Sequence, residues 1–113
     1  MSINSTLKAA LDAIAPVHAD EYSADESGAD TYIVINYNSR PADFGDDEPE
    51  HEVFSVQVHF YCPAGVNSLA KRRAIKKALS AAGFTWPEYI NASDRDGQHH
   101  VFECYIATGV GEE

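Results

Sequence analysis

The chain has 113 residues, 44% of them hydrophobic, and a formal net charge of −10 at pH 7. This length predicts a single domain over residues 1–113, and the hydrophobic content is too high for a wholly disordered chain. The negative charge argues against binding to DNA, RNA or an anionic membrane, because affinity for phosphate depends on Lys and Arg.

The first segment, "MSINSTLKAALDAIA", lacks the basic start and long apolar run of a signal peptide. No run of about 18 apolar residues, the length that spans a bilayer, occurs in the chain. The two cysteines, Cys62 and Cys104, do not form a Cys-x-x-Cys pair. These features predict a reduced, cytoplasmic protein.

The first predicted element is a short helix over residues 5–16. Ser5 is expected to cap its N-terminus, and Pro16 to end it. Its apolar residues recur at helical spacing: Leu7, Ala10, Leu11 and Ile14. Residues 17–23 are a weaker strand candidate, followed by a turn at Gly28.

Two strands are predicted next. Residues 31–38 are β-branched and aromatic, with apolar side chains on both faces, as in a covered strand. Residues 52–62 alternate between apolar and polar side chains, which is typical of a half-exposed antiparallel strand.

A second helix is predicted between residues 66 and 82, where apolar residues recur every three or four positions. Asn67 or Ser68 is expected to cap its start, and Gly83 stands where a C-terminal cap belongs. The apolar stripe consists of Val66, Leu69, Ala70, Ala74, Ile75, Ala78, Leu79 and Ala82.

A hairpin closes the predicted fold. Residues 84–92 form an irregular strand that Pro87 places at an edge, and an Asp-Gly turn leads to a strand over 99–108. Residues 109–113 are expected to be a frayed tail. The order of elements predicts an α+β fold, with two helices packed against a single mainly antiparallel sheet of four to five strands.

An acidic loop is predicted over residues 39–51, between the two central strands. The acids that we assign to a contact surface are Asp43, Asp46, Asp47, Glu48 and Glu50. A two-metal site would need carboxylates on separate rigid elements, about 4 Å apart around the ions, whereas these share one loop. A solvated or partner-facing loop is therefore favoured over a metal site.

Other candidate sites are weaker. His59 could meet His99 or His100 across the sheet and bind zinc with Cys62 or Cys104, but no zinc-type ligand spacing is present. A Ca²⁺ loop template fits residues 92–103 only in part, because Ala92 stands at its first ligand position. Both cysteines fall on apolar strand faces, which favours a core role over a nucleophilic one. We expect no catalytic site and no cofactor.

Basic residues cluster on the second predicted helix, in "KRRAIKK" (71–77). Three interpretations remain: a nucleic-acid patch, a solvated helix face, or one half of a head-to-tail contact with an acidic surface of a second copy. A contact of this kind that closes on itself makes a ring. The residues assigned to it are Lys71, Arg72, Lys76 and Lys77.

Three segments together resemble a known family: "YIVINYNSRPADFGDDEPEHEVFSVQVHFYCP", "LAKRRAIKKALSAAGF" and "DRDGQHHVFECYIATG". Their succession is similar to the small tail terminator (tail completion, minor tail) proteins of long-tailed bacteriophages and prophages. The likeness spans roughly residues 17–109 and includes no catalytic motif.

The resemblance implies a structural virion assembly protein without catalysis or cofactor. Such a protein forms a ring, typically a hexamer, that caps the tail tube and joins it to the head. Its partners are then its own copies, the tail tube protein and a head–tail connector or neck protein, with neither nucleic acid nor membrane bound directly. It would be found in the host bacterial cytoplasm during assembly and then in the virion tail.

An alternative function from another class is an acidic DNA mimic that inhibits a host nucleic-acid enzyme. The net charge of −10 favours it. The clustered basic helix opposes it, because a mimic requires a continuous negative face.

Overall fold

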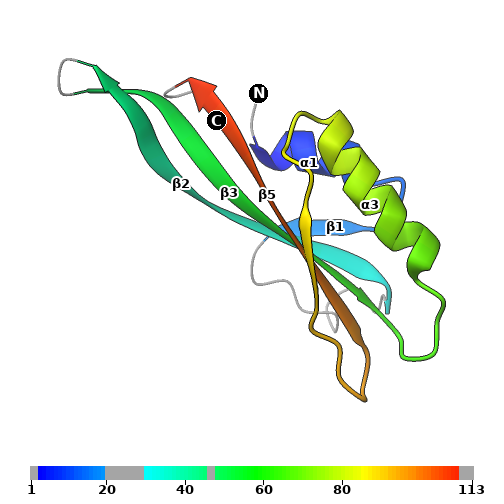
Figure 1. Cartoon of the computed structure of the whole chain (residues 1–113). Coiled ribbons are helices and arrows are strands. Elements are labelled where there is room, and N and C mark those ends of the chain that lie inside the picture. The colour runs from blue at the N-terminus through cyan, green and yellow to red at the C-terminus, as the bar shows by residue number, and fades with distance from the viewer. Residues whose placement is uncertain (1–2, 20–29, 46–47, 110–113) are drawn as a thin grey trace.

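The computed structural model describes residues 3–19, 30–45 and 48–109, with only the backbone path at 40–45, 48–51 and 108–109. Figure 1 shows two helices lying against one sheet. In chain order the elements are α1 (Ile3–Leu11), β1 (Val17–Ala19), β2 (Tyr32–Gly45), β3 (Glu48–Cys62), α3 (Leu69–Ala81), β4 (Glu88–Asn91) and β5 (Gln98–Gly109).

The sheet has five strands in the order β1-β2-β3-β5-β4. β1 runs parallel to β2, and the other three neighbouring pairs are antiparallel. The predicted α+β fold with a mainly antiparallel sheet is therefore confirmed, and the sheet is mixed because β1 runs parallel to β2. β4 lies at an edge of the sheet, as predicted from Pro87, which directly precedes it.

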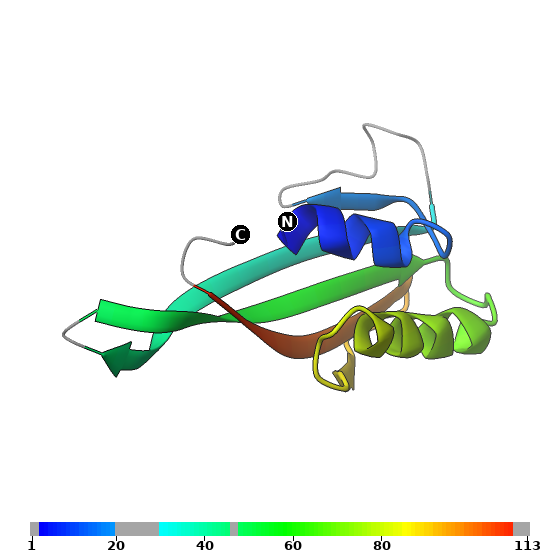
Figure 2. The ribbon, with the colours of Figure 1, turned by 90° about the horizontal axis from the view of Figure 1, so that it is seen from above.

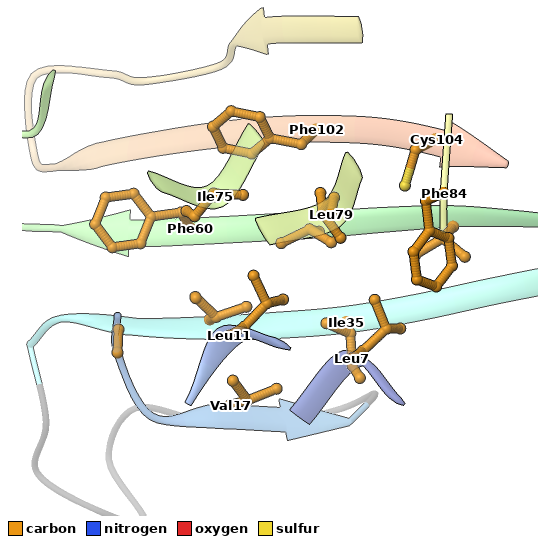
Figure 3. Packing of buried hydrophobic residues seen from close by; sticks show 14 of the residues in the cluster. Leu7, Leu11, Val17, Ile35, Phe60, Ile75, Leu79, Phe84, Phe102 and Cys104 are labelled. Carbon is orange, nitrogen blue, oxygen red and sulfur yellow. The ribbon is translucent and has the colours of Figure 1, made fainter. Parts of the chain in front are cut away.

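Both helices cover the same face of the sheet, and the core lies between the two layers (Figures 2 and 3). Leu7 and Leu11 of α1 and Ile75 and Leu79 of α3 are fully buried there. Each such side chain stabilises the fold by about 1.5–3 kcal/mol through burial. The sheet contributes alternate residues of its central strands: Ile33, Ile35, Phe54, Val56, Val58, Phe60, Cys62, Phe102 and Cys104.

The first helix starts earlier than predicted. It includes Ile3, so Ser5 lies inside the helix and the expected cap is wrong. Ile3 is buried and extends the stripe of Leu7 and Leu11 by one turn, so core packing favours the longer helix over a cap at Ser5. The strand predicted from residue 17 is confirmed as far as Ala19, and its remaining residues lie outside the described chain.

The second helix ends as predicted. Gly83 has φ +101°, its N–H donates to the Ser80 carbonyl over 3.2 Å, and the Phe84 N–H donates to the Leu79 carbonyl over 3.1 Å. This is the Schellman arrangement, which glycine favours because a left-handed residue has to follow the last turn. Buried Phe84 and Leu79 supply its hydrophobic contact.

The start of this helix differs from the prediction. Val66 and Leu69 are 48% and 42% exposed, so the N-terminal part of the predicted stripe faces solvent. Ser68 stands at the cap position, but its hydroxyl makes no capping hydrogen bond to the helix. Asn67 instead accepts a hydrogen bond from the Leu69 N–H over 3.1 Å.

The loop predicted over residues 39–51 is the largest correction. β2 and β3 continue through it, with paired register from Ser39↔Phe54 to Gly45↔Glu48, so residues 39–45 and 48–51 are strand. Continued pairing satisfies backbone groups that a loop would leave to water. We call residues 39–45 and 48–54 the arm. Its end projects beyond the helices in both views (Figures 1 and 2).

Candidate functional site

The acids assigned from the sequence concentrate at the end of the arm. Asp43 lies in β2, and Glu48 and Glu50 lie in β3 on the returning strand. Asp46 and Asp47 fall outside the described residues. The end of the arm lies far from α3 in both views (Figures 1 and 2). Acidic and basic segments of one copy are thus at different ends of an elongated molecule of 54 × 27 × 24 Å.

The basic residues of α3 divide into two groups. Lys71 ties the two helical segments together, because its ammonium donates to the Ile14 carbonyl over 2.8 Å. Arg72 and Lys76 are half-buried, and their charges lie 5.9 Å and 5.1 Å from the centre of the Tyr89 ring. Contacts of this kind attract a cation to the ring face. These three residues therefore have roles within the subunit.

Lys77 belongs to the second group, together with Arg73. Both are exposed on α3. From the sequence, the four assigned bases are equivalent. In the structure Lys71, Arg72 and Lys76 contact other parts of the subunit, whereas the exposed Lys77 is placed for a contact with another molecule. Arg73, which was not assigned from the sequence, joins it.

A polar network lies on the helix side of the sheet around His100, which is only 2% exposed. The Tyr89 hydroxyl lies 2.6 Å from His100 Nδ1, and the Gln98 Oε1 lies 2.8 Å from His100 Nε2. Since Oε1 can only accept, the Nε2 carries the proton and the tyrosine hydroxyl donates to Nδ1. The lowered pKa of His100 favours this neutral form.

The same network continues to α3. Arg72 Nε donates to Ser68 Oγ over 2.9 Å, and the Ser68 hydroxyl donates to Gln98 Oε1 over 2.8 Å. The Gln98 amide nitrogen donates to the carbonyls of Pro63 and Val66. The network therefore fixes the start of α3 and the connection before it against β4 and β5.

Burial lowers the pKa of His100, and the charge of Arg72 lowers it further. A protonated imidazole would also lose its acceptor for the Tyr89 hydroxyl. Ser68 lies 3.4 Å from His100 Nε2, but its hydroxyl already donates to Gln98 and is 2% exposed. This pair is suited to holding structure and unsuited to attacking a substrate.

The opposite face of the sheet carries stacked rings. Tyr32, Tyr61 and His99 share one row across three strands. Their ring centres are 5.0 Å apart between the tyrosines and 4.3 Å apart between Tyr61 and His99. Tyr61 therefore has a stacked ring on each side, with Tyr32 on one and His99 on the other.

His59 and His99 lie next to each other on this face, as the zinc site considered from the sequence requires. His59 Nδ1 lies 2.8 Å from His99 Nε2, and the Asn36 amide nitrogen lies 3.3 Å from His59 Nε2. Burial lowers the pKa of both histidines, and the neighbouring His99 lowers that of His59 further.

The zinc site considered from the sequence is not assembled. Cys62 and Cys104 are buried on the helix side, so they do not face the His59–His99 pair. In the described ranges, no group of three or more His, Cys, Asp or Glu side chains is placed to hold a metal ion. His99 and His100 face opposite sides of the sheet, which confirms the alternation predicted for them.

Both thiols belong to the core, as their strand positions predict. Cys104 is fully buried, and burial raises its pKa to about 12. Burial also raises the pKa of Cys62. A thiol of raised pKa carries little thiolate near pH 7, so neither cysteine is suited to be a nucleophile.

The chain matches no protein-family model, and a search of curated proteins finds no significant relative. In the part of the chain that the structure describes, none of the helices has the length and apolarity to cross a membrane.

Sequence reasoning missed the His100 network and the apolar residues exposed along β4 and β5. Trp86, Ile90 and Tyr105 are 59%, 64% and 38% exposed. The network links positions far apart in sequence, and only the register between β4 and β5 brings Tyr89 to His100. The exposed residues resemble ordinary strand residues in the sequence, and no local signal distinguishes them from residues of a covered face.

Proposed function

We propose that this chain is a structural subunit of a long-tailed phage or prophage. In this proposal copies associate head to tail into a homo-oligomeric ring, six in number as the resemblance implies. The ring caps the tail tube and joins it to the neck of the head. The subunit acts through its surfaces and has no catalytic role.

The observation that carries the proposal is the separation of opposite charges on one subunit. The helical layer, defined as residues 3–15 and 69–82, contains six basic residues and a single acid, Asp12. The end of the arm carries Asp43, Glu48 and Glu50, and it points away from that layer (Figure 1). Acids and bases that cannot meet within one copy can meet between copies.

The geometry also suits a heterologous contact. The two surfaces differ. When the arm of one copy pairs with the helical layer of the next, the first copy still has a free helical layer and the second a free arm. A chain of such contacts ends only when it closes into a ring or forms a filament. A cap that stops the growth of a tail tube has to be a closed ring.

The proposal is tested with the purified protein and tail tube protein from the same genome. Negative-stain images are expected to show rings at tube ends, and polymerising tubes are expected to stay short when the protein is added. Raising the salt concentration is expected to weaken the rings, because exposed charges are screened.

Two results would overturn the proposal. One is a protein that neither associates nor binds tubes or neck components. The other is an affinity capture that recovers a host nucleic-acid enzyme in place of tail proteins, which would favour the DNA-mimic function.

A further inference from the structure

Two imidazoles lie side by side on the face of the sheet opposite the helices. His59 belongs to β3 and His99 to the neighbouring β5. Their ring centres are 5.0 Å apart, their planes differ by 29°, and His59 Nδ1 lies 2.8 Å from His99 Nε2. Both rings are half-buried, and in the part of the chain that the structure describes the helices cover the other face (Figures 1 and 2). A solvated ion therefore reaches this pair without crossing the core.

Neighbouring side chains hold the two rings in place. The His99 ring stacks on Tyr61, with ring centres 4.3 Å apart. The Asn36 amide nitrogen lies 3.3 Å from the second ring nitrogen of His59, Nε2. Groups that are positioned in advance lose little conformational freedom when they bind a ligand.

The short contact between the imidazoles is one that a metal ion can take over. A hydrogen bond between two ring nitrogens requires a proton on one of them and a lone pair on the other. When that proton moves to the far nitrogen of its own ring, both near nitrogens carry lone pairs and the ring stays neutral. An ion then replaces the bridging proton without any net release of protons.

The distance between the two nitrogens favours one coordination geometry. Bonds from imidazole nitrogen to a divalent transition-metal ion are about 2.0 Å long, so two neighbouring ligand atoms are about 2.8 Å apart in a square plane and about 3.3 Å apart in a tetrahedron. The observed 2.8 Å corresponds to the square plane, which Cu²⁺ and Ni²⁺ adopt. Of these two ions, Cu²⁺ binds nitrogen ligands more tightly.

We propose that His59 and His99 form a bidentate site for a square-planar transition-metal ion, with Cu²⁺ as the preferred ion. Asn36 is a positioning residue, because its amide oxygen accepts a hydrogen bond from His59 Nε2 when the ion occupies Nδ1. Water or a group from another molecule completes the coordination. The site requires neither cysteine, unlike the zinc site considered from the sequence, and it does not depend on the proposed tail function.

Calorimetric titration of the protein, prepared without a histidine tag, with CuCl₂ tests the site. His59→Phe and His99→Phe keep an aromatic ring and remove the ligand nitrogens. Each is expected to weaken copper binding by more than about tenfold, because losing only a hydrogen-bond partner of a ligand costs about 10–100-fold. The matched control is His18→Phe, since Val34 separates His18 from His59 in the same row across the sheet, and its copper affinity is expected to stay unchanged.

A second pair of variants tests the positioning role of Asn36. Asn36→Leu is expected to weaken copper binding about 10–100-fold. Asn38→Leu makes the same change at an exposed position two residues further along β2 and is expected to leave the affinity unchanged. Circular dichroism checks that all variants fold.

Pulsed electron paramagnetic resonance of the wild-type copper complex gives a readout that a change in folding does not produce. The spectrum is expected to show two imidazole nitrogens bound to the ion, and a single one in His59→Phe. The melting temperature of the wild type is expected to rise with copper, because the ion joins β3 to β5 in the folded state only.

Three results would overturn this inference. They are equal copper affinities for the wild type and His59→Phe, a wild-type spectrum without a pair of imidazoles, and tighter binding of Zn²⁺ than of Cu²⁺. None of them bears on the proposed function, which fails separately if the protein does not bind tail tubes.

Discussion

The Tyr89 hydroxyl donates a hydrogen bond of 2.6 Å to Nδ1 of His100, a histidine that is only 2% exposed. This bond joins the edge strand β4 to β5 beneath α3. Arg72 Nη1 in turn donates to the Tyr89 oxygen over 3.4 Å, so the pair also connects to the helix. The relationship explains how the charged helix is held at a fixed place on the sheet.

Removing the Tyr89 hydroxyl is expected to destabilise the fold. Tyr89→Phe leaves the buried His100 Nδ1 without its donor, which costs about 1–3 kcal/mol of unfolding free energy. Urea denaturation followed by circular dichroism measures this loss. The matched control is Tyr105→Phe, whose hydroxyl contacts Glu103 at an exposed position and should matter by less than about 0.5 kcal/mol. Equal effects of the two variants would contradict the role given to the network.

The fold is expected to lose stability as the pH falls below about 6.5, the ordinary pKa of histidine. The pKa values of His59, His99 and His100 are all lowered by burial. The unfolded chain therefore binds protons at a higher pH than the folded one, and stability falls with pH in that window.

Urea midpoints at pH 7.5 and 5.5 test this dependence, above the range where most carboxylates titrate. The His100→Gln variant provides the comparison, because one of the three lowered groups is removed. Its midpoint should change less between the two pH values than that of the wild type. A wild-type midpoint that stays constant or rises on acidification would be inconsistent with three neutral histidines.

Gly83 is expected to resist substitution for reasons of backbone conformation alone. A Cβ at this position would meet only Ile106 Cδ1 at 3.7 Å, an ordinary contact, but φ is +101°. Gly83→Ala should therefore cost about 1–2 kcal/mol, the price of a left-handed non-glycine residue. Gly97→Ala is the control, because its Cβ has similar space and its φ is not in the left-handed range. Equal melting temperatures for Gly83→Ala and Gly97→Ala would refute the Schellman assignment.

Charge reversal at Lys77 is expected to weaken association between copies. An exposed ion pair contributes up to about 1 kcal/mol, so Lys77→Glu should reduce association about fivefold at low salt. Arg95→Glu makes the same charge change in the turn between β4 and β5, outside the helical layer, and should have little effect. Light scattering at two salt concentrations measures both. Lys71 and Arg72 are unsuitable for this test, because each has a contact within the subunit.

The sequence predicts most of the fold because its signals are local. Alternation at 52–62, helical spacing before Gly83 and the Asp-Gly turn each specify one element without reference to another. Together with similar local signals elsewhere, they predict two helices and a sheet of four to five strands, and the structure has two helices and five strands in the described residues. Ser5 shows the limit of local signals. It is a good capping residue, but it lies inside the helix because the helix extends back to the buried Ile3.

The arm shows a second limit. Acids, Gly and Pro in residues 39–51 are typical of a loop, but pairing between two strands continues through them. Strand pairing is a non-local interaction, and it overrides the weak strand propensity of Asp, Glu and Pro. The assigned bases show a third limit, because only the packing of Tyr89 distinguishes Arg72 and Lys76 from the exposed Lys77.

The measurement that tests the central claim most directly is negative-stain imaging of tail tubes assembled with and without this protein. The account predicts rings at tube ends and tubes that stop growing, with both effects reduced by Lys77→Glu. Tubes that grow equally long in its presence and carry no added density at their ends would contradict the account.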